Sequence, residues 1–438
     1  MTRAWSLALP VLTVLVVSYS LLVAGAPRKL HGARVYGGPS EGALALSLRV
    51  ESIERDGERE RAFWNGPLRV RARPAGGAEV VTEVQHAQHG VVDFELPLAR
   101  ESHGPVELEL RDAANALLAS GQFELSVTRW AARARRRGGW IRGRNDRELS
   151  VSVAAERGAF VVGSADALAI RVERAGSAVA GAALTLHAEG ARLTGAERLR
   201  TDARGRARLF FEATELNPTL RVEANTDDGQ RGVLDSGIAV VAGGMHVSPT
   251  AQGLRIESAV PRSEAFFSLV SDRQRLAGGV LALTPDGRGG AVGSAPLPPF
   301  TSPAWLVISS EVDQNSAAAI GWPLETGPEP AQTFDVPDSL LLDGLPAAFT
   351  REQTRRSRVR WLTAAFIGLA FALSVAQLVL RVRAADRQIT AHLSERLDQD
   401  PDLAARVAPR RPLGLFVAVL AIALGFIALG LVALARAG

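Results

Sequence analysis

The stretch RTDARGRARLFF, residues 200–211, predicts a tight turn followed by a β-strand with one buried face. Within it Ala207, Leu209 and Phe211 alternate with two arginines and Phe210, and this two-residue period is typical of a half-buried strand. The preceding residues TDARG contain aspartate and glycine, which favour tight turns. The stretch therefore indicates β-structure, with no competing helical stripe.

The two-residue period continues on both sides of this stretch. The apolar positions that carry it are Leu149/Val151/Val153, Leu168/Ile170/Val172, Leu184/Leu186, Leu220/Val222 and Ile238/Val240. Turn sequences such as TDDG at 226–229 separate these strands. Short strands at this spacing predict an antiparallel β-sandwich over residues 148–243.

Two other regions repeat the same unit more weakly. In each copy a glycine precedes an alternating strand and a proline 13 to 15 residues later opens another, at Gly90/Pro105, Gly205/Pro218 and Gly289/Pro303. Degenerate copies of one unit predict tandem sandwiches at 42–128, 148–243 and 244–326, the last one shortened. The expected fold class is therefore mainly β, with tandem antiparallel sandwiches.

The run AGSAVAGAALTLHAEG at 175–190, followed by RTDARGRARLFF, resembles the bacterial Ig-like and macroglobulin-like (MG2-type) β-sandwich domains. Those domains share a small-residue and glycine pattern before an A-x-V-x-L strand, and then T-D-x-x-G-x-A-x-F. The resemblance implies Ig-like sandwiches that act as spacers, adhesive modules or interaction surfaces. Thioester trapping, as in full alpha-2-macroglobulins, is not implied because the chain has no cysteine.

Three uncharged apolar runs are each long enough to cross a bilayer, since about 20 helical residues match its hydrocarbon core. They lie within residues 1–27, 361–383 and 411–438. We therefore expect an N-terminal anchor and a C-terminal helical hairpin. A short cytoplasmic loop at 384–410 joins the two helices of this hairpin. Ile389, at a helical spacing from two leucines, predicts that the helix continues into this loop.

The N-terminal run also has the features of a secretory signal, because it ends in an A-x-A motif at 24–26. Pro27 would hinder cleavage there, so a retained anchor is favoured. Basic residues flank the membrane runs almost equally on both sides, and the positive-inside rule does not decide the orientation. The sandwich fold favours export, which predicts a protein of the bacterial inner membrane with periplasmic sandwiches.

Composition excludes several classes of chemistry. The chain has 47% hydrophobic and 22% charged residues, which is sufficient for packed cores. Its lysine content is limited to Lys29, so a lysine nucleophile or P-loop lysine in the body of the protein is excluded. Zero cysteines exclude disulfides and thiolate metal sites. With no catalytic motif either, we expect a non-enzymatic protein without a cofactor.

The expected linker at 129–147 is rich in arginine and tryptophan. Its candidate contacts to an anionic surface or polymer are Arg133, Arg135, Arg136, Arg137, Trp130 and Trp140. Guanidinium groups and indoles suit lipid headgroups or an anionic envelope polymer. The alternative is a solvated linker, and nucleic acid is disfavoured for exported domains.

The second expected linker, 327–360, ends in a basic juxtamembrane segment. Its candidate lipid-headgroup contacts are Arg355, Arg356, Arg358 and Arg360. Small residues at helical spacing in the hairpin predict close helix packing or docking to a partner helix. These residues are Ala364, Gly368, Ala372, Gly414, Ala418, Ala421 and Gly425. The membrane runs carry no ionisable residue, which argues against transport.

Two weak metal motifs complete the candidates. His86 and His89, with His103 close in sequence, could bind zinc or copper, although loop histidines are more often solvated. The run DQDPD at 398–402 imitates a calcium loop but has Leu403 where that loop needs glycine, so a helix break is expected.

Taken together, the residues predict an integral membrane protein that presents Ig-like domains as a binding surface or stalk. The expected partners are membrane lipid and proteins of the membrane or envelope. A first alternative is a receptor or regulatory subunit that relays binding to the loop at 384–410. A second is a metal-dependent envelope enzyme that uses the three histidines.

Overall fold

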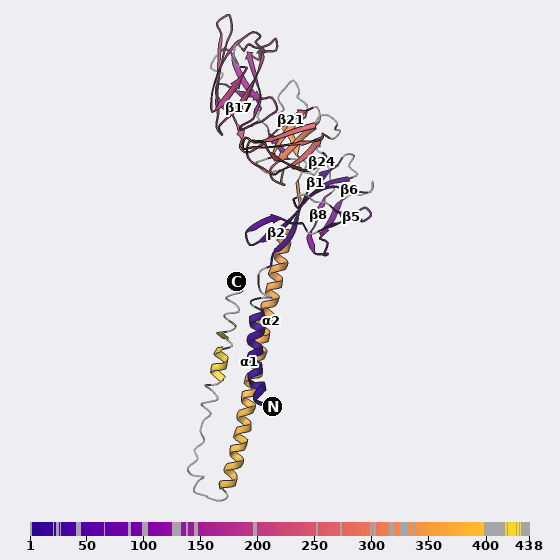
Figure 1. Ribbon diagram of the computed structural model, residues 1–438, viewed down its shortest axis with the longest axis vertical. Coiled ribbons are helices and arrows are strands. Elements are labelled where there is room, and N and C mark those ends of the chain that lie inside the picture. The colour runs from indigo at the N-terminus through magenta and orange to yellow at the C-terminus, as the bar shows by residue number, and fades with distance from the viewer. Residues whose placement is uncertain are drawn as a thin grey trace. The chain divides into compact units, whose positions relative to one another are not determined.

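The computed structural model places most of the chain in two compact units, one formed by 1–30 with 346–438 and the other by 31–345 (Figure 1). The structure describes all residues except 1, 21, 23–25, 27, 41–44, 65, 86–88, 99–103, 125–132, 137–138, 144–147, 196–198, 251–252, 272–273, 298–299, 301–303, 315–318, 325–332, 337–338, 398–416, 418, 426, 429 and 431–438. It is mainly β, with antiparallel sheets and one long apolar helix.

The elements of the first half of the chain are α1 (Thr2–Tyr19), β1 (Leu30–Pro39), β2 (Ala45–Asp56), β3 (Arg59–Ala62), β4 (Leu68–Pro74), β5 (Val80–Val84), β6 (Val91–Pro97), β7 (Pro105–Arg111), β8 (Leu117–Glu124), β9 (Arg133–Arg136), β10 (Ile141–Arg142), β11 (Ser150–Ala155), β12 (Phe160–Val161), β13 (Ala165–Arg174), β14 (Ser177–Ala178), β15 (Ala183–Glu189) and β16 (Ala191–Thr194). The remaining elements are β17 (Arg206–Ala213), β18 (Thr219–Asn225), β19 (Arg231–Gly237), β20 (Val240–Val241), β21 (Met245–Thr250), β22 (Gly253–Ser258), β23 (Glu264–Ser271), β24 (Gln274–Ala282), β25 (Thr284–Pro285), β26 (Ala291–Ala295), β27 (Ala304–Ser309), β28 (Ile320–Pro323), β29 (Thr333–Val336), β30 (Ser339–Asp343) and α2 (Leu345–Leu397).

The second sandwich contains the stretch RTDARGRARLFF, residues 200–211, from which the sequence predicts its fold. One sheet has the order β10-β11-β13-β17-β16, with β14 on β13, and the other has the order β15-β18-β19. Residues of both sheets share one core, in which Ile170 and Phe211 of the first sheet pack with Leu220 and Val222 of the second. The alternating pattern therefore buries one face of each sheet.

The turn before β17 is held by its own side chains. Asp202 Oδ1 accepts hydrogen bonds from the backbone N–H groups of Arg204 (2.8 Å) and Arg206 (2.9 Å), which lowers the pKa of this carboxyl group. Thr201 Oγ1 accepts a bond of 2.9 Å from Ala182 N in the neighbouring chain segment. Gly205 has φ +69°, and a Cβ there would lie 2.6 Å from the Val172 carbonyl oxygen. The turn therefore requires glycine at position 205, and the side chains of Thr201 and Asp202 stabilise it.

The first sandwich is built from residues far apart in sequence. One sheet has the order β3-β2-β1-β30 with β6 on β2, and the other has the order β5-β4-β7-β8. Leu342 of β30 belongs to the same core as Leu48 and Leu108. The sequence-based boundary of 42–128 is therefore too narrow, because β1 and β30 complete this sandwich from outside it.

The third sandwich has the sheet orders β21-β22-β26-β25 and β24-β23-β27-β28. Its core contains Trp322, whose indole N–H donates to the Met245 carbonyl oxygen at 3.0 Å. It is a complete two-sheet sandwich, whereas the sequence predicts a shortened copy.

Both predicted linkers contain strands. β9, in the segment 129–147, pairs antiparallel with β29, in the segment 327–360. The chain that leaves the first sandwich and the chain that returns to it therefore run side by side. The second and third sandwiches form an insertion between β8 and β30, an arrangement that local sequence patterns do not report.

Helix α2 follows β30 after one residue. Leu345 N donates to Asp343 Oδ1 at 2.9 Å, which caps the helix start. Gly344 N donates to the Ala33 carbonyl oxygen at 2.9 Å, and a Cβ on Gly344 would overlap the Leu118 carbonyl oxygen. The helix thus begins inside the predicted linker 327–360, and it runs through 361–383 to Leu397, in agreement with the predicted helical extension.

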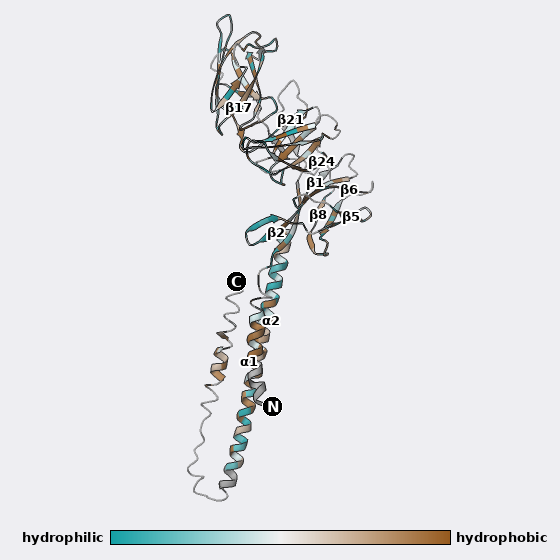
Figure 2. Cartoon of the chain, in the orientation of Figure 1, coloured by the Kyte–Doolittle hydropathy of each residue, from teal (hydrophilic) through white to brown (hydrophobic). Residues whose placement is uncertain are grey.

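Within the described residues one helix, Leu345–His392, is long and apolar enough to cross a membrane, and Figure 2 shows α2 as hydrophobic along its middle. The expected N-terminal anchor and helical hairpin are not supported. α1 is described from Thr2 to Tyr19 and is not among the candidate spans of the described residues. The described residues between 417 and 430 are helical, but too few are described to form a span.

We predict that Gly205→Ala destabilises the second sandwich more than Gly195→Ala. Both glycines have left-handed φ values (+69° and +86°), but a Cβ at Gly205 would meet backbone atoms and one at Gly195 would meet nothing within 4 Å. The expected losses in the free energy of unfolding are about 2–4 kcal/mol and about 1 kcal/mol. Amide hydrogen exchange of β13 and β17 in the intact protein measures both, and equal losses would contradict the steric role of Gly205.

Candidate functional site

A buried charged cluster connects the first and third sandwiches. Arg49 lies opposite Asp93 in the pairing of β2 with β6, and its Nε donates to Asp93 Oδ1 at 3.1 Å. Arg275 of β24 donates to the same carboxylate from the other sandwich. The side chains of both arginines are fully buried. One carboxylate is therefore shared by two guanidinium groups of different sandwiches.

Other guanidinium N–H groups of the cluster donate to oxygen atoms of both sandwiches. Arg49 Nη2 donates to the Phe267 carbonyl oxygen at 2.6 Å. Arg275 Nη1 donates to Ser47 Oγ at 2.8 Å, and its Nε donates to Ser268 Oγ at 2.8 Å. Because a buried charge is costly unless paired and hydrogen-bonded, this set of acceptors is what makes the burial of two arginines tolerable.

Electrostatics of the cluster favour the ionised form of Asp93. Burial alone would raise the pKa of this carboxyl group, but the Arg275 and Arg49 guanidinium groups outweigh burial and hold the pKa below its usual value. Gly278 faces the Arg275 guanidinium so closely that a Cβ there would overlap it. The glycine therefore makes room for the buried arginine.

A second cluster connects the second and third sandwiches. The Arg157 guanidinium lies 4.6 Å from the centroid of the Trp322 ring, and it also donates to the Val247 carbonyl oxygen. His246 Nε2 lies 3.6 Å from Asp166 Oδ2, and the His246 ring meets Trp322 edge-on. The third sandwich is thus joined to both of the others, which accounts for the single compact unit at 31–345.

The predicted metal ligands are only partly described. His89 has φ +53°, and its Nδ1 lies 3.2 Å from Glu264 Oε2 of the third sandwich. His86 and His103 lie outside the described residues, as does the calcium-like run 398–402. In the described part of the chain, no three His, Cys, Asp or Glu side chains are grouped for a metal ion. Metal binding stays an untested prediction.

The predicted arginine and tryptophan contacts separate in the structure. Arg133, Arg135 and Arg136 belong to β9, while Trp130 and Arg137 lie outside the described residues. Trp140 packs on the second sandwich, with its ring centroid 4.4 Å from the Arg171 guanidinium carbon. Arg171 was not a sequence-based candidate, because its position on a strand of alternating residues indicates only solvent exposure.

Two of the predicted juxtamembrane arginines are paired with one glutamate. Arg355 Nη2 and Arg356 Nε donate to Glu352 Oε1 at 2.7 and 2.9 Å. Arg355 Nη2 also donates to the Ala26 carbonyl oxygen at 2.9 Å, which ties the segment after α1 to α2. Arg358 and Arg360 are exposed. These two side chains are therefore the better placed to meet lipid headgroups.

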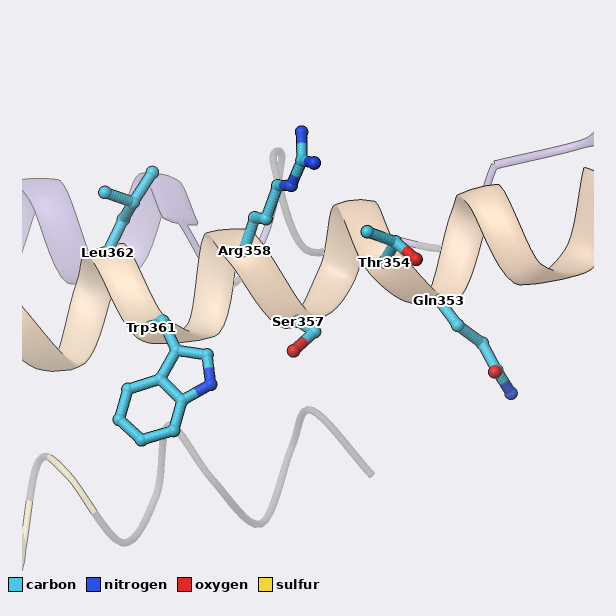
Figure 3. Close-up of a pocket in the computed structure, with 6 residues that line it drawn as sticks. All are labelled: Gln353, Thr354, Ser357, Arg358, Trp361 and Leu362. Carbon is cyan, nitrogen blue, oxygen red and sulfur yellow. The ribbon is translucent and has the colours of Figure 1, made fainter.

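A shallow hollow of about 580 Å³ lies along α2 beside the exposed arginines. Figure 3 shows Arg358 and Leu362 on one side of the helix and Trp361 on the other, and the lining residues are Gln353, Thr354, Ser357, Arg358, Trp361 and Leu362. Trp361 is 75% exposed at the start of the apolar run. Tryptophan and arginine at the end of an apolar helix are typical of a membrane–water interface.

The small-residue positions of the membrane runs are exposed within this chain. Ala364, Gly368 and Ala372 are exposed on α2, and the buried positions are Thr363, Ile367 and Ala370. Ala421 and Gly425 are exposed as well, whereas Gly414 and Ala418 lie outside the described residues. The described small residues therefore do not pack within the chain, and their docking to a partner helix stays a prediction.

No protein-family model and no curated protein sequence matches the chain. Among solved structures, the chain is similar to a tetra-tandem repeat in the extending region of a large adhesion protein (11% identity, 68% of this chain and 75% of that chain covered, TM-score 0.17). It is also similar to the D0–D1 domain of intimin (14% identity, 46% and 98% covered, TM-score 0.16). A third similar structure is Escherichia coli alpha-2-macroglobulin activated by porcine elastase (10% identity, 71% and 41% covered, TM-score 0.17). TM-scores this low establish neither a shared overall arrangement nor a function.

We predict that Asp93→Asn destabilises the contact between the first and third sandwiches by about 3–5 kcal/mol, because it leaves two buried guanidinium groups without their counter-charge. The folded pKa of Asp93 lies below the ordinary value of 3.8, so its contribution is complete above that pH and is lost as the pH falls through the folded pKa. Urea unfolding between pH 2 and pH 7 should show a weaker pH dependence in the variant.

The control for this prediction is Asp56→Asn, which changes an exposed aspartate at the end of the same strand β2. It should leave both the stability and the acid dependence close to those of the wild type. A loss of stability in Asp93→Asn no larger than in Asp56→Asn would show that the cluster does not hold the sandwiches together.

Proposed function

We propose that the chain is a non-enzymatic, membrane-anchored protein of the bacterial envelope whose joined β-sandwiches form a stalk that presents a binding surface. The observation that carries this proposal is the long apolar helix α2, which follows β30, the last strand of the first sandwich, after one residue of sequence.

The membrane part of the proposal rests on α2. Its apolar run at 361–380 has about the length of a hydrocarbon core, and it is preceded by exposed Arg358, Arg360 and Trp361. Each arginine close to an anionic membrane surface contributes about 1 kcal/mol to membrane binding. In this proposal α2 anchors the protein in the inner membrane.

The non-enzymatic part of the proposal rests on what the buried polar side chains contact. Arg49, Arg275 and Arg157 donate to backbone carbonyl oxygens, serine hydroxyl groups and one carboxylate across sandwich interfaces. These contacts hold domains together. A stalk or a binding surface needs such rigidity, and it needs no cofactor.

A second candidate function is a transmembrane relay to the region 384–410. The observation that favours it is the continuity of α2, which extends from Leu345 through the apolar run to Leu397. A helix without a break over this length can connect the two sides of a bilayer. Deletion of 384–410 should abolish a relayed output and leave membrane attachment intact.

We predict that Leu369→Arg with Leu373→Arg releases the protein from membranes. Both leucines are exposed in the apolar run of α2, at 59% and 46%. Each arginine at the centre of a membrane helix costs about 2.5–3.5 kcal/mol on insertion scales. Alkaline carbonate extraction of membranes, followed by immunoblotting, measures the retained fraction.

The matched control is Ile389→Arg, which changes a 56% exposed residue of the same helix beyond the apolar run. This variant should stay in the membrane pellet with the wild type. Wild-type protein in the carbonate supernatant, or retention of the double variant in the pellet, would contradict the proposed role of α2.

A further inference from the structure

The contact between the first and third sandwiches contains a further charged side chain beside the cluster of Arg49, Asp93 and Arg275. Glu51 follows Ser47 and Arg49 at two-residue intervals on β2, so the three side chains lie on one face of the strand. Ser47 and Arg49 both bind residues of the third sandwich. Glu51 therefore lies on the face of the first sandwich that meets the third.

Within the first sandwich the Glu51 carboxylate has two partners on β1. Tyr36 Oη donates to Glu51 Oε2 at 3.4 Å, and Arg34 Nη1 lies 3.8 Å from the same oxygen. Arg34 is shared, because its Nη2 donates to Glu60 Oε2 at 2.9 Å and its Nε lies 3.7 Å from Asp343 Oδ2. The charge of Arg34 is thus divided among three carboxylates, while the Glu51 side chain is only 19% exposed.

Burial and charge both disfavour the ionised form of Glu51. Burial raises the pKa of this carboxyl group above its ordinary value of 4.5, and Arg34 and Tyr36 offset burial only in part. The negative charges of Glu60 and Asp313 raise this pKa further. Asp313 belongs to the third sandwich, in the segment that follows β27. Ionised Glu51 is thus repelled by a carboxylate of the other sandwich.

The closed contact therefore favours the protonated form of Glu51. A carboxyl group whose pKa is raised in the closed contact stabilises this contact most below its ordinary value of 4.5. The stabilisation is lost as the pH rises through the raised pKa, because the ionised form is both buried and repelled. Asp93 has the opposite dependence, since its lowered pKa makes its contribution complete above 3.8. Together the two groups make the contact strongest in mild acid and weaker at neutral pH.

We infer that Glu51 makes the contact between the first and third sandwiches a pH-sensitive joint, which closes more tightly in mild acid and loosens at neutral pH. This inference goes beyond the proposed function and does not depend on the membrane helix. Histidine titrates in a neighbouring pH range, and two histidines lie at the joints of the third sandwich, His89 beside Glu264 and His246 beside Asp166. The effect of Glu51 is therefore measured as a difference between variants at the same pH.

The test uses the absence of cysteine from the chain, because two introduced cysteines can then be spin-labelled without background. Ala114→Cys, in the turn between β7 and β8, and Arg288→Cys, in the turn before β26, place one label on each sandwich at exposed positions. Double electron–electron resonance on the purified full-length protein in detergent measures the distance distribution between the labels. This distribution should be narrower at about pH 5 than at about pH 7.5, because protonated Glu51 no longer repels Asp313.

The deciding variant is Glu51→Gln, which keeps the size of the side chain and an acceptor oxygen for Tyr36 but removes the charge. At about pH 7.5 it should raise the ratio of closed to open contact severalfold over the wild type, and its distance distribution should change less with pH. The matched control is Glu58→Gln, which removes the same charge from an exposed residue of the hairpin between β2 and β3. The control should keep the pH dependence of the wild type.

Urea unfolding provides a second measurement, without labels. The unfolding midpoint of Glu51→Gln should lie above that of the wild type at about pH 7.5, and the two midpoints should converge at about pH 5. A midpoint below that of the wild type at neutral pH would overturn the inference, because it would show that Arg34 and Tyr36 need the ionised carboxylate. Equal distance distributions for Glu51→Gln and the wild type at neutral pH would overturn it as well, and so would an equal narrowing in Glu58→Gln.

Discussion

The arrangement of the sandwiches depends on one shared carboxylate. Asp93 lies between Arg49 of its own sandwich and Arg275 of the third, and neither guanidinium has contact with water. An interface of this kind tolerates little displacement, because a small shift would leave a buried charge without its partner. The cluster therefore defines how the two sandwiches meet, while apolar contacts supply the area. Gly278 and the Phe267 carbonyl oxygen complete the site by giving space and an acceptor.

The contact between the first and third sandwiches also affects how the first sandwich is completed. β30 returns to β1 only after the chain has formed the two other sandwiches, and Leu342 then enters the first core above Gly121, where a Cβ would overlap it. The entropy of closing so long a loop is reduced when the inserted sandwiches are already held against the first one. The buried cluster and the ribbon of β9 with β29 both hold them there. The first sandwich is thus complete only when the whole unit 31–345 has assembled.

The sequence predicts local features well and non-local ones poorly. The turn at 201–205 and the strand carrying Phe211 follow from alternation and turn chemistry, and both are correct because their hydrogen bonds lie within a few residues. β1 and β30 have no local signal that joins them, so the predicted range 42–128 does not contain their pairing. Arg49, Asp93 and Arg275 occupy positions that alternate with apolar residues, where a charged side chain normally faces solvent. Their burial comes from the contact between the first and third sandwiches, in which each covers the charged face of the other. No local sequence pattern contains this contact.

Arginine has two distinct environments in this chain, and the difference explains why composition alone is a poor guide to function. At the sandwich interfaces a buried guanidinium group donates to fixed carbonyl, hydroxyl and carboxylate oxygens, and the side chain serves structure. On the outer face of the second sandwich, Arg171 and Arg208 instead meet single glutamates, Glu173 and Glu156, and the Arg208 side chain is 62% exposed. A chain that uses arginine for nearly all of its positive charge thus contains both kinds of site with the same residue type. Only the acceptors around each guanidinium group, and its exposure, distinguish a connection between domains from a solvated ion pair on the surface.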